Sequence, residues 1–212
     1  MSPSWTTLLP QVGRVVIITG STVGIGLALT QIYYDTGATV YMTARNETKA
    51  HAAIYVITTA SNSKICSTIK FPAIDLSDLR TITPFATVFL SQESRLDILH
   101  SNAGVACVPL SQRTVQGLEP HMGTNCVGPY LLTSLLSDVL VCTTGASDTA
   151  PKSMRVIWSS SLLVDTSAPS EGVPLEELEN PSEDAIQITQ SAKPEPGSLP
   201  IALPSRFMHE TV

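Results

Sequence analysis

The sequence predicts an α/β fold in which a parallel sheet is covered by helices on both faces. Short β-branched runs alternate with helix-patterned segments over the first 165 residues, and this alternation is typical of βαβ units. The first run, RVVIITG at 14–20, is apolar almost throughout, as expected for a strand buried on both faces. Apolar residues make up 43% of the 212-residue chain and charged residues 14%, which is a globular composition.

The individual elements follow in order along the chain. Strands are expected at 14–20, 38–44, 64–71, 95–101 and 154–160. Helices are expected at 24–37, 47–60, 76–90 and, for the most part, 114–141. Asn46 is available to cap the second helix, whereas Pro84 falls inside the third helix pattern, where a proline removes a hydrogen-bond donor.

The composition changes after about residue 165. Residues 166–204 contain seven prolines and only short helix-like stretches. We therefore predict a folded domain over 1–165 and an irregular, proline-rich tail over 166–212.

Charge and cysteine content exclude several classes of protein. Lys and Arg number 12 against 18 for Asp and Glu, so the formal charge is −6, which argues against a nucleic-acid partner. The four cysteines form no zinc-binding pattern, so no metal site is expected. The N-terminus lacks the apolar region of a signal peptide, and the longest apolar stretch, 127–142, is too short to span a bilayer. These features predict a cytoplasmic protein with no membrane span.

A glycine-rich loop, TGSTVGIG at 19–26, stands between the first strand and the first helix. Gly20, Gly24 and Gly26 have GxxxGxG spacing, which lets the backbone approach a pyrophosphate at a helix N-terminus. A tight turn without a ligand is the simpler interpretation, but the position after the first buried strand favours a nucleotide. A P-loop is disfavoured because no Gly-Lys-Ser/Thr follows.

The end of the second strand indicates which dinucleotide is bound. The strand ends Thr43-Ala44-Arg45, and a cation at this position suits a 2′-phosphate, which favours NADP over NAD. The alternative is an ordinary solvated arginine.

Six motifs in order resemble those of the short-chain dehydrogenase/reductase family, most closely its retinol-dehydrogenase-like branch with fungal members. They are TGSTVGIG (19–26), TARN (43–46), Asp75-Leu76, SNAG (101–104), HMGTNCVGPYLLT (121–133) and RVIWSSS (155–161). The resemblance implies a Rossmann-type, doubly wound parallel sheet in three αβα layers. It also implies that NADP is bound by Gly20, Ser21, Gly24, Ile25, Gly26, Arg45, Asp75, Asn102, Ala103 and Gly104.

The resemblance further implies hydride transfer between the nicotinamide and a carbonyl or alcohol carbon. The family's tetrad is Asn, Ser, Tyr and Lys, in which Tyr donates a proton, helped by the neighbouring Lys, and Ser orients the substrate oxygen. Asn125 matches the Asn, and family spacing places the Ser at Ser161, with Ser160 as the alternative.

The catalytic Tyr and Lys of the family have no match in this chain. All five tyrosines precede Ser161. Crude alignment of ITQSAK places Ile188 at the Tyr and Ala192 at the Lys, with Lys193 one place late. The family's last strands are also missing, so the C-terminal part looks truncated or altered. A frameshift or splicing change near codons 185–193 is one hypothesis for the abrupt loss of resemblance.

Three interpretations follow from this departure. The first is an NADP-dependent oxidoreductase acting on a small carbonyl or alcohol substrate. The second is a catalytically impaired or inactive protein that binds the dinucleotide, and the third is a truncated product with little function. The family often forms homo-oligomers, and the sequence leaves the oligomeric state open.

Overall fold

The computed structural model describes residues 9–61, 65, 67–109, 111–145 and 153–161. The chain divides into two compact units. The first comprises Met1–Ile74, Val88–Asn102 and Leu136–Ile157, and the second comprises Asp75–Thr87, Ala103–Leu135 and Trp158–Val212.

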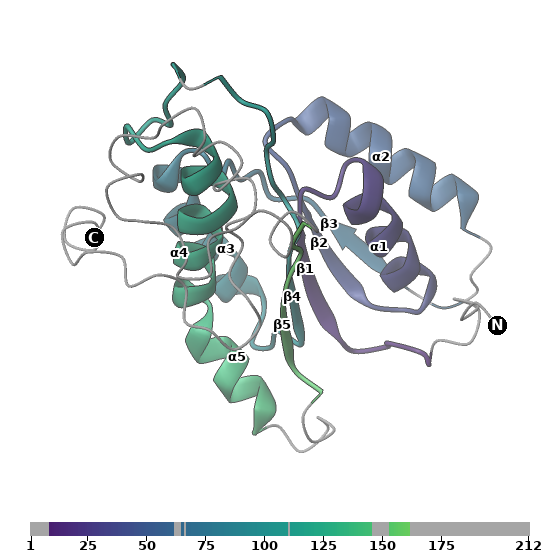
Figure 1. Cartoon of the computed structure of the whole chain (residues 1–212). Helices are drawn as coiled ribbons and strands as arrows, with labels where there is room; N and C mark the ends of the chain where they lie inside the picture. The colour runs from purple at the N-terminus through teal and green to yellow at the C-terminus, as the bar shows by residue number, and fades with distance from the viewer. Residues whose placement is uncertain (1–8, 62–64, 66, 110, 146–152, 162–212) are drawn as a thin grey trace. The chain divides into compact units, whose positions relative to one another are not determined.

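The first unit is built on a five-stranded sheet (Figure 1). In chain order the strands are β1 (Val15–Thr19), β2 (Thr39–Thr43), β3 (Thr68–Lys70), β4 (Ile98–Ser101) and β5 (Arg155–Trp158). Their spatial order is β3-β2-β1-β4-β5, and β1 pairs in parallel with both β2 and β4. The chain therefore reverses its direction of winding at β1, and ligands of such sheets bind at the carboxyl ends of the strands beside this switch point.

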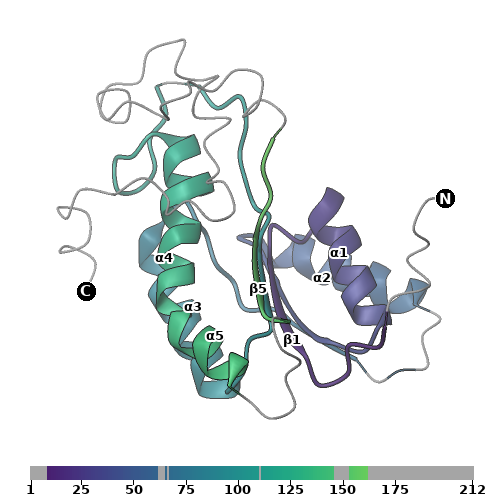
Figure 2. The ribbon, with the colours of Figure 1, turned by 60° about the horizontal axis from the view of Figure 1, so that its bottom comes forward.

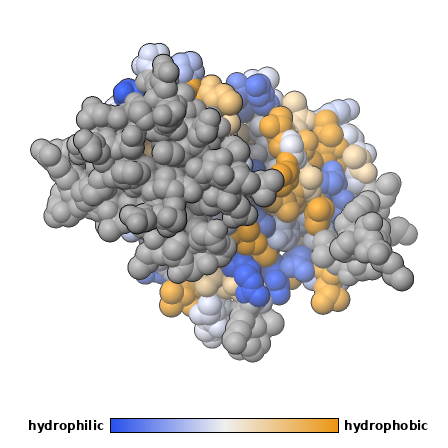
Figure 3. Space-filling view, viewed as in Figure 1, coloured by the Kyte–Doolittle hydropathy of each residue, from blue (hydrophilic) through white to orange (hydrophobic). Residues whose placement is uncertain are grey.

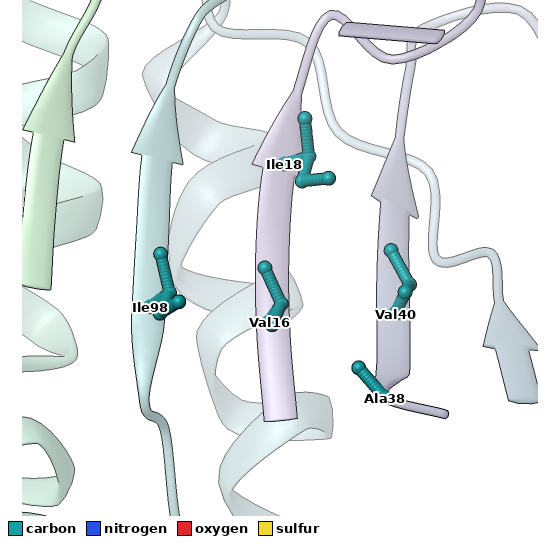
Figure 4. Close-up of a cluster of buried hydrophobic side chains, with 5 residues drawn as sticks. All are labelled: Val16, Ile18, Ala38, Val40 and Ile98. Atoms are coloured by element: carbon teal, nitrogen blue, oxygen red, sulfur yellow. The ribbon is translucent and has the colours of Figure 1, made fainter. Parts of the chain in front are cut away.

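Helices cover both faces of this sheet, as predicted. In both views, α1 (Gly24–Asp35) and α2 (Glu47–Ala60) lie on one side and α5 (Ser137–Thr144) lies on the other (Figure 2). The α1 face carries a cluster of side chains that β1, β2 and β4 bury side by side (Figure 4). Its members are Val16, Ile18, Ala38, Val40 and Ile98. Leu29 and Tyr33 of α1 pack against this cluster, so burial of β-branched side chains holds α1 on the sheet.

The helix ends of the first unit agree closely with the sequence pattern. Asn46 caps α2 by accepting a hydrogen bond from the Lys49 N–H at 2.9 Å, and the bounds of α2 match the predicted 47–60 range. Gly37, just beyond α1, has φ +97°, a left-handed conformation that favours glycine. Strand β3 is shorter than predicted, since it covers three residues of the 64–71 range.

The third helix starts later than the sequence predicted. A short 3₁₀ turn, η2 (Leu79–Thr81), precedes α3 (Ile82–Gln92), so the helix predicted to start at 76 begins at Ile82. Pro84 thereby falls in the first turn of α3, where the N–H groups have no intrahelical partner and proline is tolerated.

The predicted helix over 114–141 is wrong at its N-terminal end. Residues 111–118 form turns and irregular structure. The helical stretch is then interrupted by a π-helix, η3 (Met122–Val127), which continues into α4 (Gly128–Leu135). Isolated π turns are frequent at functional sites, and this one contains Asn125.

The described part of the surface carries both apolar and hydrophilic residues. Where Figure 3 is coloured, apolar and hydrophilic residues are interspersed, which is usual for a protein surface. Among the described residues, no single helix is long and apolar enough to cross a membrane. The consecutive helices over 122–135 and 137–144 reach the required length and composition only together, a property shared by buried core helices.

Candidate functional site

Three positions of the glycine loop after β1 favour glycine, two because of backbone conformation and one because of space. Gly20 and Gly24 have φ values of +65° and +57°, which side chains rarely adopt. At Gly26 the constraint is space, because an added Cβ would lie 2.3 Å from the Gly20 carbonyl oxygen and 2.7 Å from Asn102 Nδ2. The loop backbone therefore forms a turn that presents peptide groups rather than side chains to a ligand.

Asn102 joins this loop to the end of β4. Its Nδ2 donates to the Thr19 and Gly20 carbonyl oxygens at 3.1 and 3.3 Å, and its backbone N–H donates to Thr19 Oγ1 at 3.0 Å. The structure therefore brings together two motifs that the sequence analysis singled out separately, the glycine loop and SNAG.

The N-terminus of α1 is open to an anion. Val23 occupies the N-cap position and makes no side-chain capping bond, and the first turn contains no acidic residue. Ile25, in that turn, is 70% exposed. Free N–H groups and the positive end of the helix dipole favour a phosphate at such a site. The residues present therefore fit the pyrophosphate of a dinucleotide.

Ser21 ties the glycine loop to the end of β2. Its buried side chain donates from Oγ to the Thr43 carbonyl oxygen at 3.1 Å. Arg45 follows two residues later and is exposed. The loop and the cation predicted to contact the ribose phosphate are thus anchored to the same strand end.

In the second unit, Asn125 holds the segment that follows SNAG. Its Oδ1 accepts from the Val105 N–H at 2.8 Å and its Nδ2 donates to the Val105 carbonyl oxygen at 3.0 Å. A Cβ added at Gly104 would lie 3.2 Å from Asn125 Oδ1, so Gly104 allows this close approach. Ala103 precedes it and is half-buried. The Asn125 side chain thus makes hydrogen bonds within the protein.

Asp75 shapes the start of the second unit. Its Oδ1 accepts from the backbone N–H and the hydroxyl of Ser77 at 2.9 and 2.6 Å. Its carbonyl oxygen accepts from Thr81 Oγ1 at 2.9 Å. The segment predicted to contact the adenine is therefore a hydrogen-bonded turn.

The predicted catalytic serine lies just beyond β5. Ser160 and Ser161 are both exposed and belong to the second unit. The positions aligned with the family's Tyr and Lys, Ile188 and Ala192, lie outside the described residues.

One tyrosine has a lysine partner, but its environment does not suit a proton donor. In the first unit, Lys70 Nζ donates to Tyr41 Oη at 3.0 Å, and Tyr41 Oη donates to Glu93 at 2.9 Å. Burial raises the pKa of the Tyr41 phenol, and the hydrogen bond from Lys70 lowers it only in part. An activated phenol needs the opposite shift, so we assign this pair to packing between β2 and β3.

A second pair, half-buried Tyr33 and buried His100, was not predicted from the sequence. The Tyr33 hydroxyl and His100 Nε2 are 3.0 Å apart, and burial lowers the pKa of His100 to about 4. The imidazole is therefore neutral near pH 7 and links α1 to β4 rather than serving as an acid.

Comparison with known proteins decides the family. The sequence profile described as short chain dehydrogenase matches residues 14–157, from just before β1 to within β5. The chain belongs to the short-chain dehydrogenase/reductase family. This confirms the resemblance and the Rossmann-type fold.

The similar short-chain dehydrogenases/reductases include fungal proteins. The chain is 43% identical over 185 residues to iacJ of Pestalotiopsis fici and 42% identical over 189 residues to a protein of Phomopsis amygdali. These alignments cover 86% and 88% of the chain but only 56% and 54% of the relatives, so the chain spans about half their length. Human retinol dehydrogenase 12 is 39% identical over 128 residues, which are 60% of the chain and 39% of that protein.

Solved structures of similar proteins support the same fold. A Mycobacterium paratuberculosis protein matches with a TM-score of 0.67 and 26% identity, over 88% of this chain and 60% of its own. A metagenomic short-chain oxidoreductase in complex with NADP matches with a TM-score of 0.53 and 30% identity, over 63% of this chain and 59% of its own.

Proposed function

We propose that this protein binds NADP and transfers hydride between the nicotinamide and a carbonyl or alcohol carbon of a small molecule. The observation that carries the proposal is the glycine loop, in which a closed backbone turn leads into an uncapped helix N-terminus. Membership of an oxidoreductase family supports the reaction class.

The choice of NADP over NAD rests on Arg45. An exposed guanidinium at the end of β2, close in sequence to the Thr43 carbonyl that Ser21 binds, is suited to a ribose 2′-phosphate. The structural similarity to an NADP complex of another short-chain oxidoreductase is in keeping with this choice.

The candidate site residues have distinct parts in the proposed reaction. When bound, NADPH would supply the hydride to a carbonyl carbon, and NADP⁺ would accept it from an alcohol carbon. The Gly20–Gly26 turn binds the pyrophosphate, Ser161 orients the substrate oxygen, and Asn125 holds the segment carrying Ala103 and Gly104 in place. Asp75 contributes to the adenine end.

A second candidate is dinucleotide binding without efficient turnover. It is favoured by the sequence, since no tyrosine follows Tyr130 and none is therefore available after Ser161. Loss of a general acid lowers rates by about 10²–10⁴-fold.

A frameshift or splicing change near codons 185–193 would explain this loss. The alignments with the fungal relatives cover 86% and 88% of 212 residues, so they must continue past residue 165 into the proline-rich stretch. Sequencing the transcript tests this idea, and a single reading frame with no alternative form would contradict it.

The first experiment is a fluorescence titration with NADPH and with NADH. We expect saturable NADPH binding, and Arg45→Ala should weaken it about 10-fold while leaving NADH affinity nearly unchanged, as for loss of one charge-assisted hydrogen bond. Lys49→Ala, which removes another exposed cation of the same region, is the matched control. Equal losses of NADPH affinity in the two variants would contradict NADP selectivity through Arg45. No NADPH binding by the wild type would contradict the proposal itself.

Turnover separates the two candidate functions. Consumption of NADPH is followed with a panel of aldehydes and ketones, in the wild type and in Ser161→Ala. An active enzyme should lose most of its rate in Ser161→Ala, whereas a binding protein shows no turnover and keeps its NADPH affinity.

The remaining predictions concern the chain as a whole. The division into a domain over 1–165 and a tail over 166–212 stays a prediction, because the tail lies outside the described residues. A cytoplasmic location is likewise a prediction from the sequence, and the family resemblance leaves the oligomeric state open.

A further inference from the structure

The segment after β4, residues 103–109, is held at two points by side chains of one helical stretch. Asn125 binds both backbone polar groups of Val105. His121 Nε2 accepts a hydrogen bond from the Val108 N–H at 3.4 Å. Asn125 is the fourth residue after His121, and this spacing puts the two side chains on one side of a helix.

Glu119 anchors His121, which holds the segment at Val108. Its side chain is 2% exposed, and its carboxylate accepts three hydrogen bonds. The donors are His121 Nδ1 at 2.5 Å, the His121 N–H at 3.0 Å and the Met122 N–H at 2.8 Å. A buried carboxylate is tolerated only when donors satisfy it in this way. Glu119 therefore both caps the start of η3 and fixes the imidazole.

The hydrogen bonds define the tautomer of His121. A backbone N–H can only donate, so Nε2 must accept from Val108 and cannot carry a proton. The proton of the neutral ring then sits on Nδ1, facing Glu119. The order of the network is thus fixed: Glu119 orients the ring, and the ring holds Val108.

We propose that Glu119 and His121 are positioning residues that hold residues 103–109 as one body against the η3 helix. Ala103 and Gly104, at the start of this segment, belong to the SNAG motif that the proposed function assigns to the nicotinamide side. The pair therefore acts on the NADP site only through the segment, and only the NADPH readout below rests on the proposed function.

Residue-resolved amide exchange tests this inference. In His121→Phe, which lacks the acceptor, the Val108 amide should exchange about 3- to 10-fold faster, as for loss of one hydrogen bond. The informative amide is Val105, whose partner Asn125 is untouched, and we expect it to accelerate by a similar factor. His121→Gln offers an oxygen acceptor near the position of Nε2 and should restore most of the protection at both amides. Amides of β1, in the other unit, should keep wild-type rates.

Several outcomes would overturn the proposal. Faster exchange at Val108 with Val105 unaffected would mean a local bond and no positioning of the segment. Equal acceleration in β1 would mean a general loss of stability. Glu119→Gln provides an independent variant should His121→Phe fail to fold, and it should give the same pattern because one amide oxygen cannot replace the carboxylate toward all three donors.

The affinity for NADPH gives a second readout. His121→Phe should raise the Kd about 3- to 10-fold and His121→Gln should restore it. If the wild type binds no NADPH, the proposed function fails, and the exchange rates at Val105 and Val108 still decide whether the pair positions the segment.

Discussion

The N-termini of α1 and α2 follow parallel strands of the same sheet, yet they are built differently. At α2, Asn46 accepts the Lys49 N–H and Glu47 adds a negative charge to the first turn. At α1, Val23 supplies no capping bond and no acidic residue lies in the first turn. The α2 end is thus capped by the chain itself, whereas the α1 end has no side-chain cap.

Under the proposed function, the missing cap of α1 coincides with the place where the cofactor binds. A capping side chain is worth about 1 kcal/mol, and α1 lacks this contribution. In exchange, free N–H groups and a positive dipole face the glycine loop, where an anion can approach the backbone. The following predictions test the comparison, in order of decreasing effect.

Closing the space at Gly26 should have the largest effect. In Gly26→Ala, the Cβ would lie 2.3 Å from the Gly20 carbonyl oxygen, and such overpacking costs about 1–3 kcal/mol. Because the loop must shift, NADPH affinity should fall by at least about 10-fold in a fluorescence titration. Gly145→Ala is the control, since its Cβ would meet nothing closer than 3.7 Å. An unchanged affinity in Gly26→Ala would mean that the loop does not bind the cofactor.

Giving α1 the kind of cap that α2 has should reverse the difference. In Val23→Asp, the carboxylate can accept from the first-turn N–H groups and should stabilise the helix by about 1 kcal/mol. It would also repel a pyrophosphate, so NADPH affinity should fall several-fold while the melting temperature rises. Val23→Asn, which caps without charge, should lower the affinity less. Equal affinities in wild type and both variants would mean that no anion binds at this helix end.

Removing the cap of α2 should change stability and little else. Asn46→Ala removes the acceptor for Lys49 N–H and should lower the free energy of unfolding by about 1 kcal/mol, measured by urea denaturation. The NADPH affinity should change far less than in Gly26→Ala. A comparable loss of affinity would mean that α2 also serves the cofactor.

The parts of the fold that the sequence predicted well depend on local patterns. The buried run of β1, the glycine loop and the Asn46 cap are each encoded within a few residues, and each lies where it was expected. The candidate site residues from Gly20 to Arg45 lie on or next to these elements, and their roles stay predictions.

The parts that were missed depend on contacts between distant segments. Gly128 lies so close to Leu76 that an added Cβ would be 2.4 Å from its carbonyl oxygen, and no pattern near Gly128 indicates this. The π turn around Asn125 and the buried Glu119–His121 pair serve a segment that lies before them in the chain. Periodicity describes one element at a time, so it could not reveal these interactions.

The hydrogen bonds of Asn102 also have a consequence for how the protein is made. The carbonyl groups that Asn102 Nδ2 binds lie 83 and 82 residues earlier in the chain. Contacts of such long range form late, after a large loop has been closed. During synthesis, the N-terminal glycine loop therefore lacks these two hydrogen bonds until Asn102 has left the ribosome. A nascent chain stalled before Asn102 would carry every glycine of the loop and still lack the side chain that binds two of its carbonyl groups.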